Sequence, residues 1–185
     1  AKHPDGLIIN IAAGLDTRFY RLDNGQLHWV DVDLPNSMAL RRSFFNDTER
    51  HQYVTGSVLE DAWCDEITPR AATLVIIEGL CMYLAPDETR GLLKRIAERF
   101  PGAEVLMECV SPFVADKSAA YFVARGMDAR FRGGLEDGKD VEAWGHTFVE
   151  QWHYFDRHPR RWGVMAIGRF IPAWRNTFKI VHLRA

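Results

Sequence analysis

The chain has 185 residues, of which 47% are hydrophobic and 26% are charged, and its formal net charge is −2. This is the composition of a globular protein that can bury a sizeable core, and the length is that of one domain. Because charges of both signs are interspersed, we expect neither a nucleic-acid partner nor a membrane partner. A small molecule is the favoured partner.

The three cysteines, Cys64, Cys81 and Cys109, are an odd number without C-x-x-C spacing. This pattern argues against a disulfide framework and against a zinc site, so no metal is expected. It is typical of a reducing compartment, and we predict a cytoplasmic location. No apolar run approaches the length of a membrane span, and the first residues lack the character of a signal peptide.

The first predicted element is a largely apolar strand over residues 7–11. It leads directly into the small residues Ala12, Ala13 and Gly14, and a short helix is expected to follow. Small side chains in a sharp turn after a buried parallel strand let the backbone approach a ligand closely. The pattern therefore predicts a ligand-binding turn.

The second predicted strand, residues 27–33, ends in Asp31 and Asp33. Nucleotide-binding α/β units place a carboxylate at about this distance from the first turn, where it binds ribose hydroxyls. The usual G-x-G-x-x-G motif is absent, so the pattern favours an adenosine cofactor without specifying which one. Arg18 is expected to pair with a ligand carboxylate or with one of these aspartates.

Strands and helices then alternate, with a helix predicted over 36–46, strands over 51–56 and 72–77, a helix over 86–100 and a strand over 104–109. In the first of these helices, Arg41 and Arg42 are expected on the solvent-facing side. This alternation predicts an α/β fold with a doubly wound, mostly parallel sheet and right-handed crossovers.

Two polar segments follow strands of this sheet, at the edge where α/β folds bind ligands. Residues 57–61 form a loop after the third strand, and Glu78 follows the most apolar strand of the chain. A carboxylate at that position is costly unless it has a partner, and Gly79 permits a close approach. We predict that Glu78 meets either a ligand or an arginine.

The C-terminal part has a different character. Helices are predicted over 117–127, 141–144 and 160–174, a glycine-rich loop over 131–140, and strands over 148–155 and 177–183. The loop could cover a substrate cavity. Two closing strands after a parallel core predict an antiparallel edge.

Four segments resemble a known family. They are residues 10–22, residues 32–35, residues 56–58 followed by Asp61 and Trp63, and residues 78–84. Together they resemble the leucine carboxyl methyltransferase superfamily, near its branch of polyketide-tailoring O-methyltransferases of the tetracenomycin type. The resemblance implies an S-adenosylmethionine-dependent methyltransferase with a Rossmann-like class I sheet and a reversed final strand.

The resemblance also implies roles for the methionine end of the cofactor. Ala12, Ala13 and Gly14 would lie under the methionine moiety, and Glu78 would lie near its ammonium or sulfonium charge. Such a pairing would offset the cost of removing the carboxylate from water.

For the adenosine end, Asp31, with Asp33 nearby, would hold the ribose hydroxyls. Ser57 and Val58 would flank the adenine ring, which requires a polar side chain and a backbone donor.

Three features depart from the family. Ala12 stands where glycine is usual, so we expect a backbone without positive φ or a slightly remodelled turn. Ser57 stands where the carboxyl-methylating branch has aspartate, which agrees better with the polyketide branch. The family's N-terminal helical segment, which carries basic residues for the cofactor carboxylate, has no counterpart, so we expect residues 1–185 to be one methyltransferase domain that lacks this segment.

The acceptor is expected to be a carboxyl or hydroxyl oxygen of a small, polyketide-like molecule, and Tyr83 is predicted to line its site or to serve in packing. Two alternatives remain. One is a degenerate methyltransferase-like domain that binds without turnover. The other is a Rossmann dehydrogenase, which the missing glycine motif and the acidic Glu78 disfavour.

Overall fold

The computed structural model describes residues 2–127, 129–156 and 159–185. The strands are β1 (Leu7–Ile11), β2 (His28–Asp33), β3 (His51–Thr55), β4 (Thr73–Ile77), β5 (Glu104–Val110), β6 (Thr147–His153) and β7 (Phe178–Arg184). The α-helices are α1 (Arg18–Leu22), α2 (Pro35–Arg42), α3 (Ala62–Asp65), α4 (Pro86–Arg99), α5 (Pro112–Val123), α6 (Pro159–Trp162) and α7 (Pro172–Arg175). The 3₁₀ helices are η1 (Cys81–Tyr83), η2 (Gly138–Trp144), η3 (Tyr154–Asp156) and η4 (Gly163–Phe170).

The strands form a seven-stranded sheet in the order β3-β2-β1-β4-β5-β7-β6. β1 pairs in parallel with both β2 and β4, and β2 pairs in parallel with β3, whereas β6 and β7 are antiparallel. The predicted α/β fold, mostly parallel with an antiparallel C-terminal edge, is confirmed.

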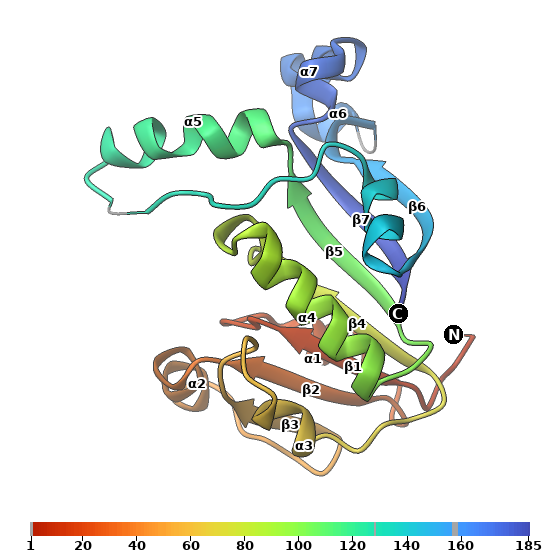
Figure 1. The fold of residues 1–185 in the computed structure, drawn as a ribbon. Helices are drawn as coiled ribbons and strands as arrows, with labels where there is room; N and C mark the ends of the chain where they lie inside the picture. The colour runs from red at the N-terminus through yellow and green to blue at the C-terminus, as the bar shows by residue number, and fades with distance from the viewer. Residues whose placement is uncertain (1, 128, 157–158) are drawn as a thin grey trace. The chain divides into compact units, whose positions relative to one another are not determined.

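The chain divides into two compact units. The first comprises Ala1–Glu78, Gly91–Val105 and Ala185, and the second comprises Gly79–Arg90 and Leu106–Arg184. In the first unit β1 lies between β2 and β4 (Figure 1), and its central strands are buried on both faces, as expected of parallel strands covered by helices.

The core of the first unit has two apolar clusters. One contains Phe19, Leu27, Trp29 and Ile76, all of them buried. The other is built on the inward side of α4, where Leu92, Leu93 and Ile96 are fully buried at helical spacing. Both clusters support the strands whose ends form the candidate site.

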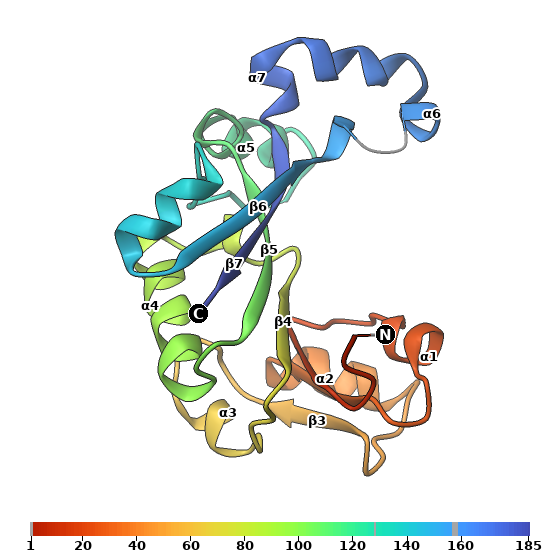
Figure 2. The same ribbon diagram turned by 90° about the vertical axis from the view of Figure 1, so that its right-hand side faces the viewer.

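In the second unit β6 and β7 form a long antiparallel ribbon (Figure 2), with a register shift between Phe148 and Glu150. The prediction of one helix over 160–174 is wrong. The segment contains α6, η4 and α7 instead, because Gly163 adopts a left-handed φ of 53° and Pro172 lacks the N–H that a continuous helix needs.

The helix predicted over 117–127 corresponds to α5, which begins and ends earlier, at Pro112 and Val123. Ser111 caps it by accepting a hydrogen bond from Val114 N, and Pro112 occupies its first turn. Among the described residues, none of the helices combines the length and the apolar character needed to span a bilayer.

Candidate cofactor site

The ends of four parallel strands lie level in the first unit. Ile11 pairs with Val32 on one side and with Ile77 on the other, so β1, β2 and β4 end together. Asp33 pairs with Thr55, which brings the end of β3 to the same edge. The polar segments that follow these strands are therefore neighbours, as the sequence predicts.

The turn after β1 has an unusual backbone. Ala12 has a φ of 54° and Gly14 a φ of 50°, both in the left-handed region. The expectation that Ala12 avoids positive φ is wrong, and its Cβ makes this conformation cost about 1–2 kcal/mol. A Cβ placed on Gly14 would meet nothing within 4 Å, so the space beside the turn is open. Ala13, by contrast, is buried.

The turn leads into α1 through Asp16. Its Oδ1 accepts a hydrogen bond from Arg18 N at 2.9 Å, so this carboxylate, one residue before the N-cap Thr17, binds the first backbone N–H of α1.

Asp31 is enclosed completely, with 0% exposure. Its Oδ1 accepts hydrogen bonds from Asn10 Nδ2 at 2.9 Å and Trp29 Nε1 at 2.8 Å. Its Oδ2 accepts from His51 Nε2 at 2.7 Å and forms an ion pair with Arg41 Nη2 at 2.5 Å. A carboxylate has about four acceptor positions, and all of them are filled by protein donors. This geometry favours a structural role for Asp31.

Asp33 lies two residues further on the same face of β2, because side chains alternate along a strand. Its Oδ2 accepts from Gly14 N at 2.7 Å and its Oδ1 from Leu34 N at 2.7 Å. About two acceptor positions remain on this carboxylate. Of the two aspartates predicted near the ribose, only Asp33 has room for a ligand.

Arg41 is 1% exposed, so the prediction that it faces solvent is wrong. It lies three residues after the buried Met38 and four before Phe45, whose ring lies 5.3 Å from its guanidinium. This spacing places Arg41 on the inward face of α2, and it could have been recognised from the sequence. Only Arg42 lies outside, paired with Asp47.

The loop after β3 contains Ser57, which is half-buried, and Val58, which is buried. Ser57 Oγ accepts from Leu59 N at 3.3 Å. Arg95 of α4 donates to Val58 O at 3.1 Å and to Leu59 O at 3.0 Å, and it also bonds the Asp61 carboxylate. This ion pair holds the pKa of Asp61 below its usual range.

Glu78 follows β4 and its side chain is 57% exposed. Its Oε2 lies 2.9 Å from Arg18 Nη2, and the same guanidinium bonds Asp16 through Nε at 2.5 Å. The predicted arginine partner is therefore present. Because Glu78 remains largely exposed, its carboxylate can also meet a cationic ligand.

Tyr83 ends η1 in the second unit and is 42% exposed. Its ring packs edge-on against Phe131, with 5.1 Å between the centroids. The exposed part of the ring is available to a ligand, and the packed edge fixes its orientation.

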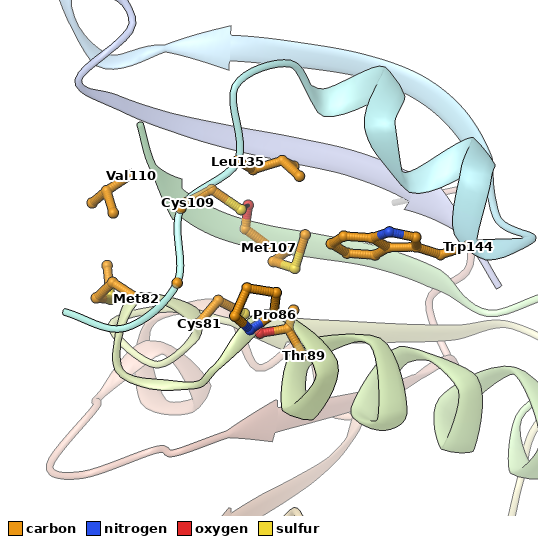
Figure 3. Close-up of a pocket in the computed structure, with 11 residues that line it drawn as sticks. Cys81, Met82, Pro86, Thr89, Met107, Cys109, Val110, Leu135 and Trp144 are labelled. Atoms are coloured by element: carbon orange, nitrogen blue, oxygen red, sulfur yellow. Dashed lines mark hydrogen bonds between the residues drawn. The ribbon is translucent and has the colours of Figure 1, made fainter. Parts of the chain in front are cut away.

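A small cavity of about 20 Å³ lies in the second unit (Figure 3). It is lined by Cys81, Met82, Pro86, Thr89, Met107, Cys109, Val110, Gly133, Gly134, Leu135 and Trp144. A space of this size holds about one water molecule and no cofactor. Burial raises the pKa of Cys109 to about 12 and that of Cys81 well above its ordinary value, so neither thiol is a ready nucleophile.

A larger hollow of about 640 Å³ lies elsewhere in the second unit. Its lining includes Phe113, His153, Arg169 and Phe170. This volume lies within the range of small-molecule sites, about 300–1,000 Å³. Within the described residues, no group of three or more His, Cys, Asp or Glu side chains is arranged to hold a metal ion.

The site and its loops lie within a region that matches a known family. The model of the family named leucine carboxyl methyltransferase matches residues 5–97. This chain belongs to the leucine carboxyl methyltransferase family. The match spans half of the chain and contains every predicted cofactor-binding residue, from Ala12 to Glu78.

Two curated relatives extend the match. The chain is 29% identical over 159 residues to the tetracenomycin polyketide synthesis O-methyltransferase TcmP of Streptomyces glaucescens, covering 84% of this chain and 59% of TcmP. It is 32% identical over 152 residues to the S-adenosyl-L-methionine-dependent methyltransferase dpfgK of Gibberella zeae, covering 73% of this chain and 50% of dpfgK. The chain thus spans between half and three fifths of these relatives, and S-adenosylmethionine is the cofactor of its family.

The fold is also that of solved methyltransferases. The O-methyltransferase NcsB1 from neocarzinostatin biosynthesis, solved with S-adenosyl-L-homocysteine and 1,4-dihydroxy-2-naphthoic acid, superposes with a TM-score of 0.61 at 15% identity. The alignment covers 98% of this chain and 49% of NcsB1. At this identity the likeness shows a shared fold.

Proposed function

We propose that this chain binds S-adenosylmethionine at the carboxyl edge of β1–β4 and transfers its methyl group to an oxygen of a small molecule. The observation that carries the proposal is the level ending of these strands, which makes the Gly14 turn, Asp33, Ser57 and Glu78 neighbours at one edge. Binding sites in open α/β sheets lie at this edge.

The chemistry of the residues fits the adenosine part of the cofactor. The two unused acceptor positions of Asp33 suit the two ribose hydroxyls, so we assign the ribose to Asp33 and a supporting role to Asp31. Ser57 offers a hydroxyl and Val58 a backbone donor to the adenine ring. Val58 O is bonded to Arg95, which fixes the backbone of the loop beside this donor.

The methionine part fits the other half of the edge. The open space beside Gly14 admits a ligand close to the backbone of Ala12 and Ala13. Glu78 brings an exposed carboxylate toward the ammonium and sulfonium charges, and its contact with Arg18 keeps the side chain ordered.

S-adenosylmethionine, when bound, supplies a methyl group on a positively charged sulfur. The protein then has to align the acceptor oxygen and to exclude water, because the reaction is an in-line displacement. A carboxylate acceptor is already ionised and requires no general base, whereas a phenol benefits from one. We propose that Tyr83 lines the acceptor site with its exposed ring.

The relatives support an oxygen acceptor of polyketide type. TcmP is an O-methyltransferase of tetracenomycin polyketide synthesis, and NcsB1 was solved with a dihydroxynaphthoic acid. A small aromatic molecule bearing hydroxyl or carboxyl groups is therefore the proposed substrate class, and polyketide biosynthesis the proposed setting.

Calorimetry with S-adenosylmethionine and with NAD tests the cofactor assignment. We expect binding of S-adenosylmethionine and no heat with NAD. Formation of S-adenosylhomocysteine in the presence of 1,4-dihydroxy-2-naphthoic acid as a probe acceptor would then show turnover. Cofactor binding without product over a panel of phenols and aromatic acids would favour the degenerate binding domain, and absence of cofactor binding would contradict the proposal.

The Glu78→Gln variant tests the electrostatic contact. The neutral amide should weaken S-adenosylmethionine binding about tenfold, or about 1.4 kcal/mol, and should weaken binding of the uncharged thioether product less. Calorimetry with both ligands measures the difference. Glu98→Gln, at an exposed position paired with Lys94, is the matched control, and equal losses for both ligands would contradict the contact with the sulfonium.

A further inference from the structure

Two arginines are placed alike beneath the two loops that border the candidate site. Both residues belong to the first unit, each side chain is largely buried, and each donates hydrogen bonds to two backbone carbonyls of one loop. Arg41 is 1% exposed and Arg95 is 17% exposed at the side chain. None of the comparisons assigns a role to either residue.

Arg41 holds the turn after β1. Its Nη1 donates to Gly14 O at 2.9 Å and its Nη2 donates to Asp16 O at 3.0 Å. Its charge is balanced by Asp31, and Asn10 joins that carboxylate to the Asp16 side chain at 3.1 Å. Asp16, Arg41, Asp31 and Asn10 thus form a closed ring of polar contacts that begins and ends at the turn.

Arg95 holds the loop after β3 in the same manner. Its guanidinium donates to Val58 O and Leu59 O, and its Nε bonds the Asp61 carboxylate. All three acceptors belong to a stretch of four residues that contains the adenine-binding candidate Val58. Arg95 therefore fixes the loop through two backbone carbonyls and one side chain.

These contacts matter because the loops have no strand neighbour to satisfy their carbonyls. The contacts to Gly14 O, Asp16 O and Val58 O are partly buried, and a carbonyl shielded from water without a donor costs free energy, so an unheld loop would move these carbonyls toward water and lose its shape. A guanidinium has five donors in a rigid plane and can serve two carbonyls and a carboxylate together. The single ammonium of a lysine keeps the charge but lacks this planar geometry.

We infer that Arg41 and Arg95 are positioning residues for the cofactor, acting through the loops that they hold. Arg41 shapes the turn under the methionine moiety, and Arg95 shapes the loop beside the adenine. The inference rests on the proposed function for the identity of the ligand. The inference predicts that each arginine affects binding of a different end of the ligand. A general role of both arginines in stability would predict no such difference.

The two assignments predict different patterns of affinity for two probes, S-adenosylmethionine and adenosine. Arg41→Lys should weaken S-adenosylmethionine binding at least about tenfold and adenosine binding less than about threefold, because adenosine lacks the methionine part. Arg95→Lys should weaken both probes by about the same factor. Calorimetry on the full chain measures all four constants.

The controls are neighbouring arginines on the same helices. Arg42 is exposed and pairs with Asp47, and Arg99 is exposed and pairs with Asp65. Arg42→Lys and Arg99→Lys should leave both dissociation constants unchanged. Melting temperatures of all four variants separate loss of affinity from loss of folded protein.

Amide hydrogen exchange in the free protein tests the same inference without any ligand. The Asp16 amide, bonded to Ala13 O, reports on the first loop, and the Glu60 amide, bonded to Ser57 O, reports on the second. Arg41→Lys should speed exchange at Asp16 alone, and Arg95→Lys should speed exchange at Glu60 alone. For a variant too unstable to measure, Asp16→Ala and Asp61→Ala remove one contact of each holding network and should give the same patterns more weakly.

The outcomes are distinct. Selective loss of S-adenosylmethionine binding in Arg41→Lys, equal loss of both probes in Arg95→Lys, and faster exchange at one amide in each variant support the inference. Equal losses for both probes in both arginine variants, or faster exchange at both amides in each, would show a general structural role and overturn it. If the unsubstituted chain binds neither probe, the proposed function fails, and the exchange pattern still decides whether the two arginines hold separate loops.

Discussion

The carboxyl edge of β1–β4 in the first unit, which is the candidate cofactor site, and residues 159–177 of the second unit are ordered in different ways. At the edge, short loops follow buried strands, and arginines and aspartates supply the missing hydrogen-bond partners. The segment that contains η4 and α7 is built of short helical turns, and its apolar side chains are exposed, with Val164 at 90% and Phe170 at 71%. The edge therefore gains its order from a buried polar network, whereas the segment buries few side chains that could fix it.

Asp31→Ala breaks the network of the edge and should have the largest effect. It leaves the buried Arg41 without its counter-charge, which costs about 3–5 kcal/mol of unfolding free energy. Because Asp31 is 0% exposed, the substitution removes a buried partner of the protein's own donors, so folding itself should be weakened. Chemical denaturation measures the loss.

Asp47→Ala is the matched control for this measurement, because Asp47 forms an exposed ion pair with the neighbouring Arg42. Its loss should cost less than about 1 kcal/mol. If both variants lost the same small amount, the buried network would contribute little to the stability of the edge.

The sequence predicts the edge better than the segment for a physical reason. Apolar runs followed by Gly14, Asp33, Ser57 and Glu78 encode the parallel strands and the common edge at which they end, and the register confirms both. Asp31 and Arg41 lie on different elements and meet only in the folded chain. The helical spacing of α2 could therefore predict that Arg41 is buried, but not that Asp31 is its partner.

The structure of residues 160–174 is hard to predict for a different reason. Their apolar spacing is helical, yet Gly163 and Pro172 interrupt the backbone and favour short turns over one helix. A single glycine has a small helical cost that packing can override, and here little packing opposes it. The positive φ of Ala12 is likewise not encoded by its neighbours in sequence, because the turn that contains it is held by Asp33 and Arg41 through Gly14.

His146, in the second unit, should make the free energy of unfolding depend on pH. This side chain is buried, neither of its nitrogens has a partner among the described residues, and desolvation lowers its pKa. The unfolded chain therefore binds the proton more readily, so stability falls as the pH drops below about 6.5, by at most about 1.4 kcal/mol per pH unit. Burial also lowers the pKa of His153, so this histidine makes stability fall at low pH as well.

Denaturation between pH 5 and pH 8 measures this dependence. His146→Leu removes the titrating group and should flatten the curve, while His153 retains part of the slope. His3→Leu, at an exposed position, serves as the control. An unchanged slope in the His146 variant would show that this histidine does not couple protonation to folding.

The smallest expected effect concerns the turn of the edge. Ala12→Gly relieves the left-handed strain of about 1–2 kcal/mol but adds freedom to the unfolded chain, for a net gain of about 0.5–1 kcal/mol. Thermal denaturation should show a slightly higher melting temperature. Ala13→Gly, at a buried position without positive φ, should lower it instead. A destabilised Ala12 variant would argue that its methyl group packs favourably in the turn.

The most direct test of the cofactor edge is the dissociation constant of S-adenosylmethionine for Asp33→Asn, measured by calorimetry beside the unsubstituted chain. Asp33 accepts from Gly14 N and Leu34 N and has about two acceptor positions left for the proposed ribose contact, so its neutralisation should weaken binding about tenfold or more while the protein stays folded. An unchanged dissociation constant in a folded variant would contradict the assignment of this edge to the cofactor.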